Sequence, residues 1–205
     1  MKIKIGGASI EHDTRRIFAA AEAAPETSFV LDANASLTGT EALELLRALG
    51  NLRERVALFE QPTAAGDLAG LRLVRSAGVR VAADESVRDA SDVQRLVEAR
   101  AADVVNLKIM KAGLVAALDA AAAARSAGLG LMIGGMVETR LSMSASACLA
   151  GGLGGFSFVD LDTPLFLAWD PFEGGFEMRG SELDLRGIRL GHGVRPRAGL
   201  LPTRC

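Results

Sequence analysis

Three carboxylates follow short apolar runs in the sequence, and their positions suggest a shared role. Asp32 lies in LDAN, Glu60 in LFEQP and Asp84 in AADES. Apolar runs bounded by turn residues are typical of buried strands. An unpaired buried carboxylate is strongly destabilising, so each of the three needs a partner. One divalent cation would satisfy all three, although a local arginine or a helix cap could pair with any one of them alone.

Two lysines continue the same spacing on either side of the carboxylates. Asp32 and Glu60 are 28 residues apart, and Glu60 and Asp84 are 24 apart. Lys4 precedes Asp32 by 28 residues, and Lys108 follows Asp84 by 24. A strand, a turn, a helix and a second turn need about this length. One ionisable group at the carboxyl end of each strand is the pattern of a (β/α) barrel mouth.

The donor set and the lysines predict the kind of chemistry. Ligation by oxygen alone favours Mg²⁺, or Mn²⁺, over Zn²⁺. A lysine close to a cation and to another lysine should have a lowered pKa and could act as a general base. Lys4 and Lys108, facing each other, could move a proton from one face of a carbon to the other, with Lys2 against a developing enolate oxygen. The alternative is that Lys108, or its neighbour Lys111, is a solvated loop residue.

Composition and charge exclude several classes of protein. The chain has 205 residues, is 49% hydrophobic and carries a net charge of −2, which does not suggest a nucleic-acid binder. The sequence has no apolar stretch of membrane-spanning length and no visible signal peptide. Its two cysteines do not make a disulfide framework. We therefore expect a cytoplasmic protein with a small-molecule substrate and no nucleic-acid or membrane partner.

Strand-like and helix-like segments alternate along the chain. Seven apolar strands are predicted, separated by helices over residues 13–24, 38–49, 67–76, 91–99, 114–127 and 139–150. Apolar strands alternating with helices indicate a parallel sheet covered by helices. We predict an incomplete TIM-type barrel over residues 1–170, and a C-terminal extension over residues 171–205 whose β-hairpin packs outside it.

Seven strands are one short of a closed barrel, which would leave two unpaired edges. Such edges favour self-association, so a homo-oligomer is expected. A doubly wound open sheet is the alternative fold. Against it, no glycine-rich phosphate loop follows a strand, and polar groups recur at every strand end and not at one switch point.

Several motifs, in order, resemble the C-terminal barrel of the enolase superfamily. They are KIKIGG, LDAN, FEQP, ADES, NLKIMKAG and FVDLD, and they are most similar to its dipeptide epimerase branch within the muconate lactonizing group. The resemblance implies that Mg²⁺ binds to the three carboxylates and that Lys4 and Lys108 are the acid/base pair. It also implies that Asp160 and Asp162 hold the α-ammonium group of a substrate. Otherwise, these two acids form only a turn at a strand end.

The implied reaction is the epimerisation of a dipeptide, of the L-Ala-D/L-Glu type, by 1,1-proton transfer through an enediolate that Mg²⁺ and Lys2 would stabilise. The family's N-terminal capping domain and first barrel strand are not found in this sequence. Two alternatives remain. A cycloisomerase or o-succinylbenzoate synthase would use the same lysines and metal, and a truncated fragment without the cap could keep the metal site without turnover.

Overall fold

A curled parallel sheet forms the centre of the fold. In the computed structural model, which describes residues 1–199, seven strands lie in chain order and each pairs in parallel with the next. They are β1 (Lys2–Lys4), β2 (Phe29–Asp32), β3 (Val56–Glu60), β4 (Val81–Ala83), β5 (Val104–Leu107), β6 (Gly130–Ile133) and β7 (Phe156–Val159). The predicted incomplete barrel is confirmed. The consecutive strand order excludes the doubly wound alternative, in which the order reverses at a switch point.

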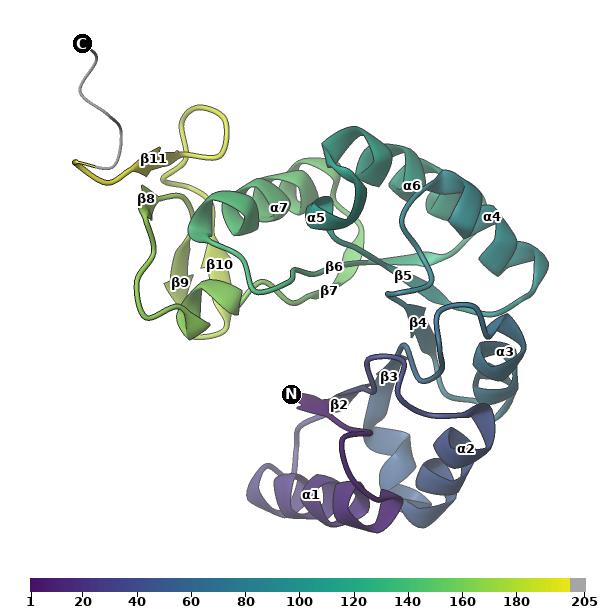
Figure 1. The fold of residues 1–205 in the computed structure, drawn as a ribbon. Helices are drawn as coiled ribbons and strands as arrows, with labels where there is room; N and C mark the ends of the chain where they lie inside the picture. The colour runs from purple at the N-terminus through teal and green to yellow at the C-terminus, as the bar shows by residue number, and fades with distance from the viewer. Residues whose placement is uncertain (200–205) are drawn as a thin grey trace.

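Helices follow the outer side of the curled sheet (Figure 1). They are α1 (Ile10–Ala23), α2 (Gly39–Ala48), α3 (Leu68–Ser76), α4 (Ala90–Glu98), α5 (Ile109–Ala112), α6 (Leu114–Ser126) and α7 (Arg140–Leu153), with 3₁₀ helices η1 (Gly50–Arg55) and η2 (Thr163–Phe166). The six longer α-helices confirm the predicted ones, whereas α5, η1 and η2 were not predicted. In the part of the chain that the structure describes, no helix has both the length and the apolar character needed to span a membrane.

Side-chain caps explain where two of these helices begin. Thr38 and Glu41 form a reciprocal capping box at the start of α2. Asp89 caps α4, because its Oδ1 accepts hydrogen bonds from the backbone N–H groups of Ser91 (2.8 Å) and Asp92 (3.1 Å).

The inner face of the sheet carries a small apolar cluster next to the charged groups. Its buried members are Leu58, Ala82, Val104 and Met132, and it is separate from the main core. Alternate residues of a strand point to the same face. Glu60 therefore lies on the same face as Leu58, and the carboxylates lie at the carboxyl end of the barrel interior.

The barrel is open between β1 and β7, each of which pairs on one side only among the described strands. A cavity of about 380 Å³ lies there, and its lining includes Met1, Val30 and Phe158. One ion pair spans the opening, because Lys2 Nζ is 2.5 Å from Oδ2 of Asp160, which follows β7. The curl of the sheet thus brings its two edges close together at this end.

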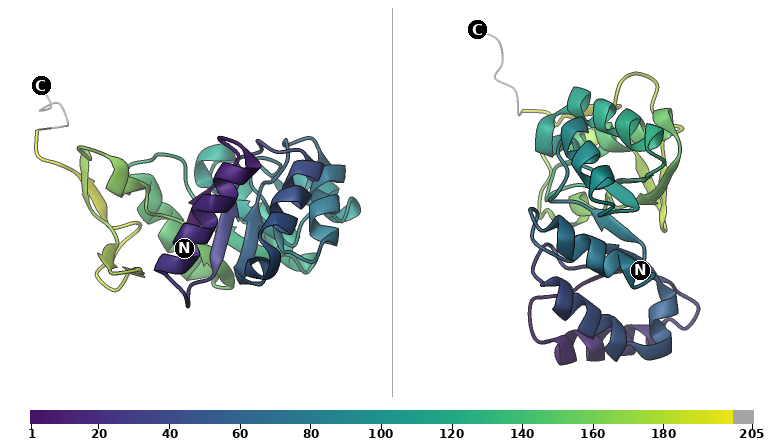
Figure 2. Two further views of the ribbon diagram at one scale, coloured as in Figure 1. Left: turned by 90° about the horizontal axis from the view of Figure 1, so that it is seen from below. Right: turned by 90° about the vertical axis from the view of Figure 1, so that its right-hand side faces the viewer.

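The C-terminal extension packs against α7 and lies to one side of the barrel (Figure 2). β9 (Glu177–Arg179) and β10 (Glu182–Asp184) pair in antiparallel fashion and form the predicted hairpin. β8 (Phe172–Gly174) and β11 (Val194–Pro196) form a second antiparallel pair that was not predicted. Phe176, 1% exposed, anchors the extension. The division at residues 170/171 stays a prediction, and residues 200–205 lie outside the described residues.

Candidate active site

Three buried carboxylates meet at the carboxyl ends of neighbouring strands. Asp32 is the last residue of β2, Glu60 the last of β3, and Asp84 directly follows β4. Asp32 and Glu60 are direct partners in the sheet register. The three side chains are at most 1% exposed. The sequence-predicted set therefore forms one continuous acidic row, and each member needs a positive partner in the interior.

Two lysines of β1 lie at one end of this row. Lys2 Nζ is 2.9 Å from Asp32 Oδ2 and 2.8 Å from Glu60 Oε2, in addition to its contact with Asp160. Lys4 Nζ is 2.5 Å from Asp32 Oδ2 and 2.8 Å from Asn34 Oδ1. Both ammonium groups reach the same carboxylate, because alternate residues of a strand point to the same face. Oxygens of Asp32 and Glu60 therefore lie within 3 Å of one nitrogen atom.

Two further lysines lie at the other end of the row. Lys108 Nζ is 2.5 Å from Asp84 Oδ2, and Lys111 Nζ is 2.5 Å from Asp84 Oδ1. Both side chains are only 9% exposed, so the alternative of solvated loop residues is wrong for both. Lys111 also donates to the backbone carbonyls of Asp84 (2.6 Å), Val87 (3.1 Å) and Asn106 (3.0 Å). Lys111 is thus a fixed structural cation, whereas Lys108 has a single carboxylate partner.

The charges of this cluster shift the pKa of Glu60. Burial raises the pKa of Glu60 to about 7, against the attraction of Lys2 and together with the repulsion of Asp32 and Asp84. A carboxyl group responds in this way when negative charges share a poorly solvated site. Burial is therefore the main cause of the raised pKa of Glu60, and the attraction of Lys2 does not offset it.

The pKa values of the two lysines at Asp84, Lys108 and Lys111, are shifted in opposite directions. Burial would lower the pKa of Lys108, but Asp84 raises it above the usual value. Burial lowers the pKa of Lys111 despite the same carboxylate. The sequence predicts a lowered pKa for Lys108. In the structure, where protein groups alone surround this lysine, its pKa is raised instead. A bound divalent cation would act against the effect of Asp84, because it adds positive charge beside the ammonium.

The oxygen atoms of the row suit a hard cation. Glu60 Oε2 and Asp84 Oδ1 accept no hydrogen bond, although Lys2 and Lys111 lie within 2.8 Å and 2.5 Å of them. These contacts are charge pairs with poor hydrogen-bond geometry. Within residues 1–199, no three acidic, histidine or cysteine side chains are arranged around one point as a ready metal cluster. The ammonium group of Lys2 lies between Asp32 and Glu60, and a cation bound to both carboxylates would have to move it aside.

Two buried amides hold the carboxylates in place, and sequence reasoning missed both roles. Asn106, 0% exposed, donates from Nδ2 to Glu60 Oε1 at 2.7 Å. Gln61 accepts at Oε1 from the backbone N–H groups of Asp84 (2.8 Å) and Ser86 (3.2 Å). The signal for Asn106 was a single polar residue inside the apolar strand VVNL. A polar side chain within such a strand requires a buried partner.

A cavity of about 410 Å³ opens over these groups. It joins the sequence-predicted lysines and acids to residues of the loops that follow β6 and β7, and its lining consists of Lys2, Lys4, Asn34, Lys108, Gly135, Met136, Val137, Asp160, Asp162, Thr163 and Phe166. Asp160 lies between β7 and η2, and Asp162 directly precedes η2. The structure thus brings all eight predicted site residues to the same end of the barrel.

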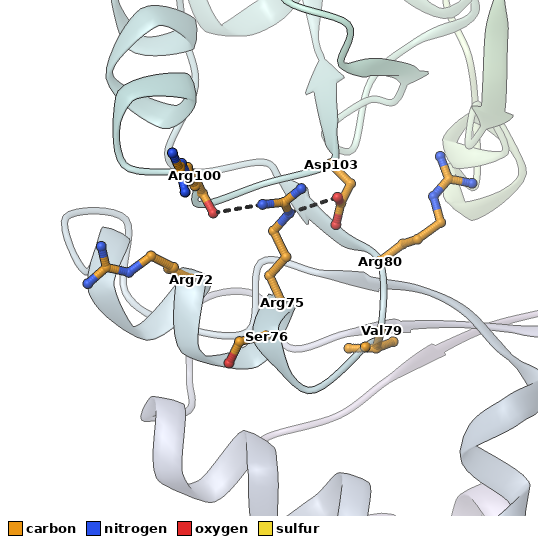
Figure 3. A pocket seen from close by; sticks show the side chains of 8 residues that line it. Arg72, Arg75, Ser76, Val79, Arg80, Arg100 and Asp103 are labelled. Atoms are coloured by element: carbon orange, nitrogen blue, oxygen red, sulfur yellow. Dashed lines mark hydrogen bonds and ion pairs between the residues drawn. The ribbon is translucent and has the colours of Figure 1, made fainter.

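A second charged cavity, of about 350 Å³, lies at the opposite end of the strands (Figure 3). Arg80 precedes β4 and Asp103 precedes β5, so this cavity is at the amino ends of the strands. Figure 3 shows Arg75 directed toward Asp103, with Nε 2.7 Å from Oδ1. Asp103 Oδ2 also accepts from the backbone N–H of Val81 at 3.0 Å. These contacts join β4, β5 and α3, and they lie apart from the carboxylate row.

Comparisons with known proteins find a matching family model and solved structures with the same fold. The family model described as "Enolase C-terminal domain-like" matches residues 1–199. The aromatic dipeptide epimerase of Herpetosiphon aurantiacus is 46% identical over 95% of this chain and 54% of its own length. The chain therefore spans about half the length of the curated relatives that it matches.

Two solved structures have the same fold. The mandelate racemase/muconate lactonizing enzyme from Roseiflexus sp. is 55% identical, with a TM-score of 0.91, over 96% of this chain and 57% of its own. The dipeptide epimerase from Enterococcus faecalis V583, complexed with Mg and L-Leu-L-Tyr, is 36% identical, with a TM-score of 0.87, over 94% of this chain and 55% of its own.

Lys111→Met tests the structural role of Lys111. We expect it to lower the free energy of unfolding by about 3 kcal/mol, because Asp84 loses one buried partner and three carbonyls lose a donor. The measurement is urea unfolding with a chelator present. Lys108→Met is the matched control, equally exposed and paired with the same carboxylate. Its loss should be clearly smaller, and equal losses in the two variants would contradict the assignment.

Proposed function

The chain belongs to the enolase C-terminal domain-like family, and from that premise we propose that its site epimerises dipeptides by a 1,1-proton transfer. The observation that carries this proposal is the position of Lys4 and Lys108 at opposite ends of the acidic row. Lys4 is on β1, before the strand that ends in Asp32, and Lys108 follows β5, beyond Asp84. A carbon atom held between them would have one amine at each of its faces.

Asp32, Glu60 and Asp84 would hold a Mg²⁺ ion in this proposal. Carboxylate oxygens are the ligands that Mg²⁺ prefers, and Mn²⁺ accepts the same donors. The bound ion would withdraw electrons from a substrate carboxylate and so acidify the neighbouring α-proton. The Enterococcus faecalis relative with bound Mg and dipeptide supports this choice of ion and of substrate class.

The protein's own residues would carry the proton transfer. One of Lys4 and Lys108 would take the α-proton as a neutral amine, and the other would return a proton to the opposite face from its ammonium group. Lys2, whose Nζ already lies between two carboxylates, would stabilise the negative charge that develops on the substrate carboxylate. Asp160 and Asp162, which line the same cavity, would bind the α-ammonium group of the dipeptide.

The transfer predicts exchange of the α-proton with solvent. With Mg²⁺ in D₂O, the chain should exchange the α-proton of the C-terminal residue of L-Ala-L-Glu, as followed by proton NMR. Lys4→Ala and Lys108→Ala should each abolish conversion to the C-terminal D-epimer, and each should keep Mg²⁺ binding by calorimetry, because neither lysine is a proposed ligand. The variant that keeps the lysine facing the α-proton of the L-epimer should still exchange that proton. Arg95→Ala, which removes an exposed cation of α4, is the control and should exchange as the unaltered chain does. Epimerisation that persists in either lysine variant would refute the two-base mechanism.

The role of Asp162 separates dipeptide epimerisation from the other reactions of related barrels. Asp162→Asn should raise the KM of L-Ala-L-Glu about tenfold, because one charge-assisted contact to the ammonium is lost. N-acetyl-L-Ala-L-Glu has no ammonium group, so its binding should change much less. An equal loss for both ligands would rule out ammonium recognition by this residue.

A further inference from the structure

The cavity over the carboxylates has an apolar side as well as a charged one. Met136 and Val137 lie in the loop between β6 and α7, and Phe166 ends η2. They are 50%, 70% and 67% exposed, respectively, and all three line the cavity that Lys108 and Asp162 also line. Exposed apolar side chains grouped within a charged site indicate a ligand with an apolar part.

Buried hydrogen bonds and packing contacts support the β6–α7 loop, whose apolar side chains are exposed. Glu138, 3% exposed, accepts the backbone N–H of Met136 at Oε1 (2.6 Å), and Ser142 Oγ donates to its other oxygen. A Cβ atom at Gly135 would lie 2.6 Å from the Met143 side chain, so the loop backbone packs directly on α7. Met136 and Val137 are therefore presented by a well-supported loop.

Glu138 also connects the β6–α7 loop to η2. The backbone N–H of Glu138 lies 3.4 Å from Thr163 Oγ1, which in turn is 3.4 Å from the carbonyl oxygen of Glu138. Thr163 is the first residue of η2, and Phe166 is the last. The three apolar side chains thus belong to two elements that are fixed to each other, and they form one surface.

The strand order shows where the apolar surface of Met136, Val137 and Phe166 lies within the site. β6 lies between β5, which leads to Lys108, and β7, which leads to Asp160 and Asp162. The loop after β6 therefore lies between one proton-transfer lysine and the acids proposed for the ammonium group. A dipeptide bound across these groups would place its amino-terminal residue beside the apolar surface.

We propose that the site selects dipeptides whose amino-terminal residue has an apolar side chain larger than methyl, and that Met136, Val137 and Phe166 contact it. The inference rests on the proposed function. An apolar side chain gains by leaving water at this surface. A charged side chain would lose hydration there, with no partner offered by these three residues.

The test compares three dipeptides that share a C-terminal alanine: L-Leu-L-Ala, Gly-L-Ala and L-Glu-L-Ala. For the full chain with Mg²⁺ in D₂O, kcat/KM of α-proton exchange at that alanine is measured by NMR. L-Leu-L-Ala should exceed each of the other two by about tenfold or more, which is the discrimination that small apolar contacts supply.

Two variants test whether Phe166 and Val137 cause the preference for an apolar amino-terminal side chain. Phe166→Ala, which truncates an exposed ring, and Val137→Thr, which keeps the side-chain shape, should each lower the ratio of L-Leu-L-Ala to Gly-L-Ala by about threefold or more. Leu165→Ala is the matched control, because Leu165 is 65% exposed on the same 3₁₀ helix but does not line the cavity. It should keep the ratio of the unaltered chain.

The outcomes separate this inference from the proposed function. Exchange with equal kcat/KM for all three dipeptides, or a ratio that neither Phe166→Ala nor Val137→Thr changes, overturns the apolar selection and leaves epimerisation standing. Absence of exchange with every dipeptide overturns the proposed function, and the inference fails with it.

Discussion

The burial of three carboxylates at adjacent strand ends is the constraint on which the site depends. Asp32, Glu60 and Asp84 are nearly inaccessible to water, and each lies at the end of a strand whose alternate residues face the barrel interior. Charges in such a position need opposite charges or metal ions at contact distance. The fold meets this need by bringing side chains from five consecutive strands and their loops to one end of the sheet.

All the lysines of the protein pair with carboxylates of the acidic row. The sequence contains only four lysines, and Lys2, Lys4, Lys108 and Lys111 all contact the acidic row, whereas the remaining basic side chains outside the two histidines are arginines. The four differ in their surroundings. Lys111 is tied to three carbonyls, and Lys2 to three carboxylates, so each has a fixed position. Lys4 and Lys108 have fewer partners, which suits groups that would gain and lose protons.

Spacing along the chain predicted the barrel and its acidic row, because each strand–helix unit repeats one apolar run that stops at one charge. It did not predict the roles of Lys111 or Asn106, which depend on contacts between residues of different strands and loops. Lys111 reaches Asp84 only because the four-residue helix α5 turns the chain back after Lys108, and so short a helix leaves little periodicity in the sequence. The β8–β11 pair was missed for a similar reason, since its strands are three residues long and twenty residues apart.

The central claim, that three carboxylates share one cation, can be tested directly because every lysine lies in the site. In a chain labelled with ¹³C at lysine Cε, only four lysine signals exist, and each reports on one part of the row. Titration with Mg²⁺ should shift the signal of Lys2, at Asp32 and Glu60, and that of Lys108, at Asp84, with one common dissociation constant. Two unequal constants, or shifts confined to one end of the row, would contradict a shared ion.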